Sequence, residues 1–207
     1  MKTTKWNRIS RRGYALVLAA GLLIPGISQA AIVSGETTQG TSAGDITVAV
    51  TVDDMDTIIS IIWPENRWIG ISFGEAPAHD EGYMIISSLD GIAYEANAAP
   101  KAAPVVQASQ DLTIESFVTG GGISELVLSR LSDTGDSLDF QFEAIEQTIA
   151  LQWALGFIGD DPSAKHEYRG DFLTPLVLTA VPVPAALPLL ASGLFALGLF
   201  ARRNKAA

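Results

Sequence analysis

The sequence predicts an all-β domain, an antiparallel β-sandwich with immunoglobulin-like layers, flanked by an N-terminal signal helix and a C-terminal transmembrane helix. Between residues 45 and 180 the apolar residues mostly alternate with period two, in short runs rich in Ile, Val and aromatic residues. Turn signals separate these runs every 8–12 residues or so, which is typical of a sandwich. Only the two ends of the chain contain long apolar runs that suit a helix.

Each predicted strand is bounded by Gly, Pro, Asn or Asp, as in Asp90-Gly91 and Gly120-Gly121-Gly122. We expect strands at residues 46–52, 57–63, 67–73, 83–88, 91–95, 112–118, 124–131 and 149–156, and a last one within 172–179. Residues 31–44 are rich in Gly, Ser and Thr, so we expect a flexible leader there. Residues 96–109 are expected to form a long surface loop. The folded domain is therefore predicted to span residues 45–180.

Charge is strongly segregated along the 207 residues, and the formal net charge of −10 conceals this. Five of the 13 Lys and Arg residues lie within the first twelve positions and three within the last six, whereas all 23 acids lie between Glu36 and Asp171. Residues 31–180 therefore carry five cations against 23 acids, a formal charge of −18. Nucleic-acid binding is disfavoured, because it requires a basic footprint. The chain has no Cys, which excludes disulfides and thiol chemistry.

Residues 1–30 have the pattern of a secretory signal peptide. A basic segment ends at Arg12, an apolar run follows over residues 14–24, and Ser28-Gln29-Ala30 supplies the small-x-small pattern that signal peptidase reads. We expect cleavage between Ala30 and Ala31. The alternative is an uncleaved N-terminal anchor, although the apolar run is short for a span of about 20 residues.

The C-terminal end predicts a short membrane helix over about residues 187–201. No charge occurs between Phe172 and Ala201, and the basic segment that begins with Arg202 and Arg203 follows at residues 202–207. Basic residues next to a span stay on the cytoplasmic side. The basic N-terminus follows the same rule, so both ends predict that the acidic middle is exported.

The segment before this helix carries a proline motif over residues 181–188, which begins Val181-Pro182-Val183-Pro184-Ala185. Motif, apolar helix and Arg cluster together resemble the PEP-CTERM sorting tail of Gram-negative bacteria, over residues 181–207. The resemblance implies recognition by an exosortase that cuts near the prolines. It also implies an inner-membrane precursor facing the periplasm, whose helix is a temporary anchor, and delivery to the outer surface or extracellular matrix.

The order of motifs in the middle of the chain is also distinctive. It runs from Trp68-Ile69-Gly70-Ile71-Ser72-Phe73-Gly74 through Tyr83-Met84-Ile85-Ile86, Ser129-Arg130, Asp133-Thr134-Gly135-Asp136 and Trp153-Ala154 to His166-Glu167-Tyr168-Arg169-Gly170. This series resembles a DOMON domain, over roughly residues 45–178. The resemblance implies a β-sandwich that binds haem b or, in other members, sugars.

The resemblance implies candidate haem ligands in two loops. The position of the Met ligand in haem-binding relatives falls on His79, and the later ligand position falls on His166; these are the only two histidines. A haem with two His ligands has a lower potential than one held by Met and His. Met84 is a back-up ligand, and Arg169 and Lys165 are candidates to meet the propionates. The two imidazoles must approach opposite faces of one porphyrin, with an apolar slot between them.

Several alternatives stay open. Both histidines lie beside acids and suit plain surface groups. The Asp-rich segments at residues 53–56 and 133–136 could offer oxygen ligands to Ca²⁺, but turn chemistry explains them better. Trp63, Trp68 and Trp153 could stack on sugars or form the core. No Gly-x-Ser-x-Gly elbow or distinctive carboxylate pair favours an enzyme. We therefore expect a non-catalytic module that binds haem b for electron transfer or redox sensing, with a redox partner. The rival is a haem-free module that binds a polysaccharide or other ligand, or builds extracellular matrix.

Overall fold

The structure is a computed structural model that describes residues 31–74, 82–99 and 102–182. Every regular element in these residues is a β-strand. The strands are β1 (Val33–Thr41), β2 (Gly44–Val52), β3 (Asp56–Pro64), β4 (Ile69–Phe73), β5 (Tyr83–Ser87), β6 (Ala93–Asn97), β7 (Val105–Val106), β8 (Thr113–Gly120), β9 (Ile123–Leu131), β10 (Gln147–Ile149), β11 (Leu151–Gly156), β12 (His166–Asp171) and β13 (Leu176–Ala180). The all-β prediction is confirmed for this part of the chain.

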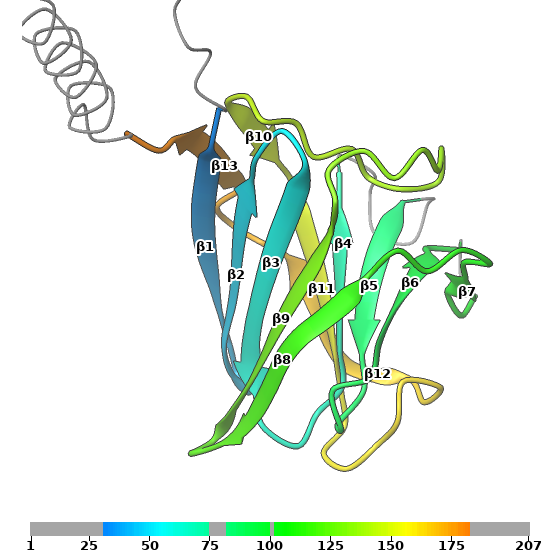
Figure 1. Cartoon of the computed structure of the whole chain (residues 1–207). Coiled ribbons are helices and arrows are strands. Elements are labelled where there is room, and N and C mark those ends of the chain that lie inside the picture. Colours follow the sequence, from blue (N-terminus) through cyan, green and yellow to red (C-terminus); the bar gives the residue numbers. More distant parts are fainter. Residues whose placement is uncertain (1–30, 75–81, 100–101, 183–207) are drawn as a thin grey trace, which may run out of the picture. The chain divides into compact units, whose positions relative to one another are not determined.

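The strands form two antiparallel sheets that face each other (Figure 1). The seven-stranded sheet has the order β10-β13-β1-β2-β3-β9-β8, and the six-stranded sheet has the order β12-β11-β4-β5-β6-β7. Sequential hairpins make the pairs β1–β2, β2–β3, β4–β5, β5–β6, β8–β9 and β11–β12. The predicted sandwich of two antiparallel layers is therefore observed.

The core lies between the sheets and follows from the period-two pattern. Ile46, Val48, Val50 and Val52 of β2 alternate with less buried residues, so one face of the strand points inward. The other sheet contributes matching inward rows, such as Ile69, Ile71 and Phe73 of β4. Each such side chain contributes about 1.5–3 kcal/mol when it is fully buried. Alternation over many short strands is thus sufficient to build one contiguous core.

The prediction of a flexible leader at residues 31–44 is wrong over most of its length. Val33 to Thr41 form β1, which pairs with all nine residues of β2 and with the end of β13. Gly35 allows close packing there, since a Cβ at this position would lie 2.1 Å from the carbonyl oxygen of Val177. Thr suits strands, and alternate residues such as Val33 and Thr37 are buried. The Gly, Ser and Thr content conceals this alternation.

Other strand boundaries differ in smaller ways. The run predicted at 149–156 is divided at Ala150 into β10 and β11, which belong to different sheets. The segment after His166, for which no strand was predicted, forms β12 beside β11, and the expected loop at 96–109 contains the two-residue strand β7. The last strand, β13, ends at Ala180, next to the predicted proline motif.

The predicted signal peptide up to Ala30, the sorting-motif residues Val183 and Pro184, the membrane helix over about 187–201 and the Arg202-Arg203 cluster lie outside the described residues. Among the residues that are described, no helix is long and apolar enough to span a membrane. Ala31, Val181 and Pro182 are described, and the backbone N–H of Val181 donates to the carbonyl oxygen of Ile32 at 2.8 Å. The two ends of the sandwich are therefore fastened to each other.

Candidate functional site

The face of the six-stranded sheet that points away from the core, hereafter the outer face, is apolar in its middle and polar toward β12. Because partners in an antiparallel ladder point to the same side, the register defines its members. They are Gly70 and Ser72 of β4, Met84 and Ile86 of β5, Tyr94 and Ala96 of β6, Gln152, Ala154 and Gly156 of β11, and Arg169 and Asp171 of β12. Trp68, Ile86 and Ala96 form a buried cluster there, with Met84, Tyr94 and Ala154 packed against it. The outer face therefore has its own apolar layer, separate from the core.

Trp68 covers one end of the outer face. Its indole lies directly over Gly156, where a Cβ would be 2.1 Å from both Cδ1 and Nε1 of the ring. The indole N–H is buried and has no hydrogen-bond partner. At Gly70, by contrast, a Cβ would lie in ordinary contact with Met84, Ile86 and Trp68, at 3.6–3.8 Å. Glycine is thus required for space at position 156 but not at position 70.

His166 begins β12 at the Trp68 end of the outer face. It pairs with Gly156, and a register shift follows before Tyr168 pairs with Leu155. His166 therefore occupies a position on the outer face beside Gly156 and is partly buried. Arg169 pairs with Ala154 and also belongs to the outer face, while Lys165 immediately precedes the strand. His166, Arg169 and the back-up ligand Met84 thus share one surface.

Arg67 holds the segment that carries His166. Its guanidinium donates to the carbonyl oxygen of Gly156 at 2.6 Å, forms a short ion pair with Glu167, and lies 5.4 Å from the centre of the Tyr168 ring. The hydrogen bond from Arg67 holds the pKa of Glu167 below its usual value. This ion pair fixes the residue next to His166 against the base of β4.

The β11–β12 loop, residues 157–165, borders the same end of the outer face. Gly159 donates its N–H to the carbonyl oxygen of Asn66 at 2.8 Å, so the loop is fastened beneath β4. Burial, and to a smaller extent the charge of Asp161, raises the pKa of Tyr94 on β6. The loop therefore extends from β11 past β4 toward β6, and His166 lies where it returns to the sheet.

His79 lies outside the described residues, so its position relative to His166 is not described. The strands that flank it are informative. Gly74 follows β4 and donates to the carbonyl oxygen of Ala150, whereas Gly82 precedes β5 and accepts from Ala98. Both lie at the end of the sheet opposite to His166, six residues from Trp68 along β4, or about 20 Å. The described residues on either side of the segment that contains His79 therefore lie at the opposite end of the sheet from His166.

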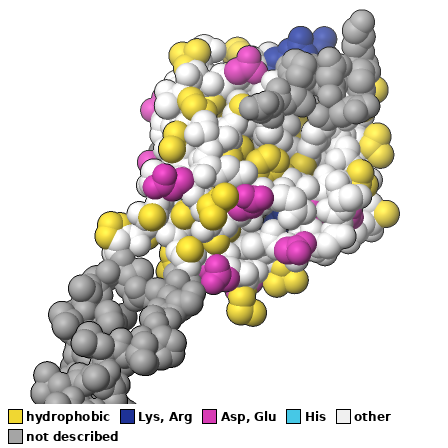
Figure 2. Space-filling view, turned by 90° about the horizontal axis from the view of Figure 1, so that it is seen from above, with side chains coloured by type: hydrophobic (Ala, Val, Ile, Leu, Met, Phe, Trp, Pro, Cys, Tyr) yellow, Lys and Arg dark blue, Asp and Glu magenta, His cyan; other side chains and the backbone are white. Residues whose placement is uncertain are grey.

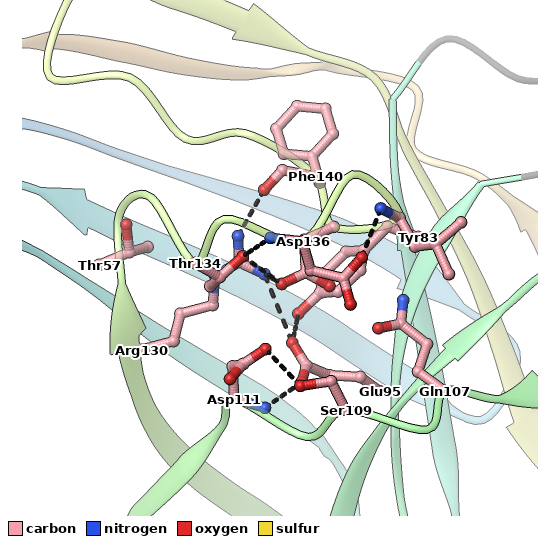
Figure 3. Close-up of polar contacts among 12 residues, drawn as sticks. Thr57, Tyr83, Glu95, Gln107, Ser109, Asp111, Arg130, Thr134, Asp136 and Phe140 are labelled. Atoms are coloured by element: carbon pink, nitrogen blue, oxygen red, sulfur yellow. Dashed lines mark hydrogen bonds and ion pairs between the residues drawn. The ribbon is translucent and has the colours of Figure 1, made fainter.

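A second polar cluster lies inside the sandwich and was not predicted. Arg130 of β9 lies 3.4 Å from Glu95 of β6 (Figure 3). It also lies 3.4 Å from Asp139 of the β9–β10 loop, and all three side chains are fully buried. Its guanidinium also donates to the carbonyl oxygen of Phe140 at 2.6 Å. The ion pairs thus connect the two sheets and the loop across one end of the core.

The carboxylate of Glu95 accepts hydrogen bonds from several groups. The Tyr83 hydroxyl donates to it at 2.7 Å and the backbone N–H of Asp111 at 2.5 Å. Burial is the main reason that the pKa of Tyr83 is raised, although Arg130 opposes the shift. The guanidinium lies 5.0 Å from the centre of the Tyr83 ring. We therefore interpret this buried network as an interaction that stabilises the fold and not as a binding site.

This cluster explains part of the motif series. Arg130 occupies an inward position of β9, in line with Leu126 and Leu128. Thr134 donates to Asp139 at 2.7 Å and so orients one of its carboxylate partners. The sequence contained an indication of this cluster, because the alternation of β9 puts Arg130 among side chains that point into the core. A buried cation of this kind needs a carboxylate partner. The carboxylate could not be identified without the fold.

The turn interpretation of the acidic segments is confirmed. One carboxylate oxygen of Asp53 accepts the backbone N–H groups of Met55 and Asp56, which lower its pKa, and Asp133 accepts that of Gly135. Within residues 31–74, 82–99 and 102–182, no three His, Cys, Asp or Glu side chains converge on a metal position. Trp63 is buried in the core and Trp153 packs against it, as expected for core residues, whereas Trp68 is buried in the separate layer on the outer face.

No protein-family model and no curated protein matches the chain. Among solved structures, one that is similar is the cytochrome b domain of pyranose dehydrogenase from Coprinopsis cinerea, with 17% identity and a TM-score of 0.45. The match covers 69% of this chain and 80% of that chain.

Proposed function

We propose that the chain is an exported β-sandwich module that binds haem b on the outer face of the six-stranded sheet. The observation that supports this most is the combination of the apolar middle of this face with His166 at one end of the face. Gly74 and Gly82, the described residues that flank the segment with His79, lie at the other end. The porphyrin would lie between the two imidazoles.

The chemistry of the outer face suits a porphyrin. Gly70, Ala96 and Ala154 are small residues, and the side chains of Met84, Ile86 and Trp68 that pack around them are apolar. The buried indole N–H of Trp68 is a donor without a partner, and a ligand with acceptor oxygens would satisfy it. Arg169 lies on this face and Lys165 immediately precedes β12, and we propose both as the residues that would meet the propionates.

The residues of the outer face would bind the haem and set the environment of its iron. His166 and His79 would each offer a neutral imidazole nitrogen, and the Arg67–Glu167 ion pair would keep β12 in register. The bound iron would supply one-electron transfer between its ferric and ferrous states. Two His ligands would hold the iron without Met84, which is then expected to pack on the outer face. A pair of His ligands would also give a lower redox potential than Met and His.

The experiment is a haemin titration of the full chain in mild detergent, followed by absorption spectroscopy. Wild type and Met84→Leu should give the same Soret band, whereas His79→Ala and His166→Ala should each lose the bis-His spectrum. Arg169→Gln should weaken binding and leave the band position unchanged. A wild-type chain without a Soret band, or a His166→Ala variant that binds like wild type, would show a haem-free module, the rival function.

We also propose that the module is delivered by its terminal sequences, through signal peptidase and an exosortase. The strand limits support this, since β1 begins at Val33, after the predicted cleavage at Ala30, and β13 ends at Ala180, before Pro182. Both cuts would leave the sandwich intact. Expression in an exosortase-positive Gram-negative host should release a shortened product, and Pro182→Ala with Pro184→Ala should retain the full-length precursor in the membrane. Equal processing of the two forms would contradict the proposal.

A further inference from the structure

The four edges of the two sheets differ in how they are protected against pairing with another chain. Exposed edge strands offer unpaired N–H and C=O groups, and natural proteins protect them by making them short or by placing charges on them. At three edges this protection is evident. β10 has three residues, β7 has two, and β12 carries Glu167, Arg169 and Asp171 among its six.

The fourth edge, β8, has less of this protection, because its β-bulge interrupts only the first part of the strand. It has eight residues, Thr-Ile-Glu-Ser-Phe-Val-Thr-Gly, with no Pro or Lys and a single charge at Glu115. Seven of the eight are exposed, and Val118 and Ile114 are 62% and 45% exposed. A register shift lies between Ile114 and Ser116, so the regular part of the edge is Ser116–Gly120, which contains no charge.

Phe117 also anchors β8 to the core. Phe117 points into the sandwich, where its ring centre lies 6.1 Å from that of Trp63. Its ring also packs on Gly91, where a Cβ would lie 2.3 Å away. Because Phe117 is anchored, the outward backbone groups of Ser116–Gly120 are presented by an ordered strand. Such a strand can accept a partner with little loss of conformational entropy.

We infer that β8 pairs with β8 of a second copy of this chain, in antiparallel register about Val118. A two-fold axis through Val118 pairs Ser116 with Gly120 of the other copy and the two Val118 side chains with each other. It also places Glu115 opposite Gly121, which keeps the two acidic side chains apart.

The net charge opposes contact between copies, and this opposition is weakest at the uncharged part of β8. Residues 31–180 carry a formal charge of −18, so two copies repel wherever carboxylates face each other. Acidic side chains are scattered over the end of the domain seen in Figure 2. The uncharged half of β8 allows two copies to approach, and the association should strengthen with added salt, which screens the remaining repulsion.

The absence of Cys from the chain provides a direct test with the full chain in mild detergent. In Val118→Cys, directly opposed strand positions would bring the two Cβ atoms close to disulfide distance. Mild oxidation should convert most of this variant to a covalent dimer. The matched control is Ile58→Cys, because Ile58 is 47% exposed on β3, an inner strand of the same sheet. Ile58→Cys should form no covalent dimer under the same oxidation at equal concentration.

Sedimentation at about 100 µM, where small interfaces become populated, provides the second measurement. Wild type and Ile58→Lys should contain dimer that increases with salt, and Val118→Lys should lose it with an unchanged melting temperature. The C-terminal segment is common to all variants, so its own contacts cancel in the comparison. Equal cross-linking of the two Cys variants, or a Val118→Lys chain that associates like wild type, would overturn the inference. Cross-linking of Val118→Cys to a different protein alone would do the same.

Discussion

Two buried arginines hold this acidic domain together in different ways. Arg130 lies inside the sandwich with Glu95 and Asp139, and none of the three side chains is exposed. Arg67 lies at the rim, where its partner Glu167 is 25% exposed. Arg130 therefore neutralises carboxylates that water cannot reach, whereas Arg67 positions the strand that begins at His166. The comparison separates a cation needed for folding from one needed for the geometry of the outer face.

The largest effect is expected from Arg130→Met. Removing the guanidinium leaves two buried carboxylates without a counter-charge, which should lower the free energy of unfolding by about 3–5 kcal/mol. Arg67→Met should cost clearly less, because Glu167 can turn to solvent. Urea denaturation of both variants checks the order. Adding Glu95→Gln and Asp139→Asn to Arg130→Met should recover part of the lost free energy of unfolding. Equal losses in Arg130→Met and Arg67→Met would contradict the difference between the two arginines.

The same arginines show what the sequence can and cannot reveal. Alternation predicted the sheets, and it placed Arg130 on a buried row. Its partners Glu95 and Asp139 are 35 and nine positions away in the sequence, and only the pairing of sheets brings them together. For β1, a composition of Gly, Ser and Thr concealed the alternation, since these residues are common to loops and strands. His166 was identified as a candidate, but its position beside Gly156 depends on the β11–β12 register.

Tyr83→Phe tests the Arg130 cluster from the side of Glu95. The variant removes a hydrogen bond to a buried carboxylate, so it should cost about 1.5–3 kcal/mol at neutral pH. Burial raises the pKa of Tyr83 in the folded state above its unfolded value of about 10. The advantage of Tyr over Phe should therefore be complete below pH 10 and decline as the pH rises beyond it. Denaturation of both proteins at pH 8 and 10.5 measures this, and a constant difference would contradict it.

Gly156→Ala tests the Arg67 end. The new methyl would lie 2.1 Å from the Trp68 indole, which must then move, at a cost of about 1–3 kcal/mol. Gly70→Ala is the matched control on the same face, because its methyl would make only ordinary contacts. Near-ultraviolet circular dichroism should change for Gly156→Ala and stay the same for Gly70→Ala. If both variants match wild type in spectrum and stability, Trp68 does not pack closely on Gly156.

The smallest effect is expected from Glu167→Gln. The Arg67 hydrogen bond lowers the pKa of Glu167 in the folded state below its unfolded value of about 4.3, so the ion pair stabilises the fold above that pH. As the pH falls through the folded-state pKa, Glu167 takes up a proton and the advantage of Glu over Gln disappears. Melting temperatures of wild type and Glu167→Gln should therefore differ at pH 6 and converge near pH 3. In the Arg67→Met background the same substitution should have a much smaller pH-dependent effect, because the largest contribution to the lowered pKa is gone and only the Tyr168 hydrogen bond still lowers it. An undiminished difference in that background would show that Arg67 is not the main partner of Glu167.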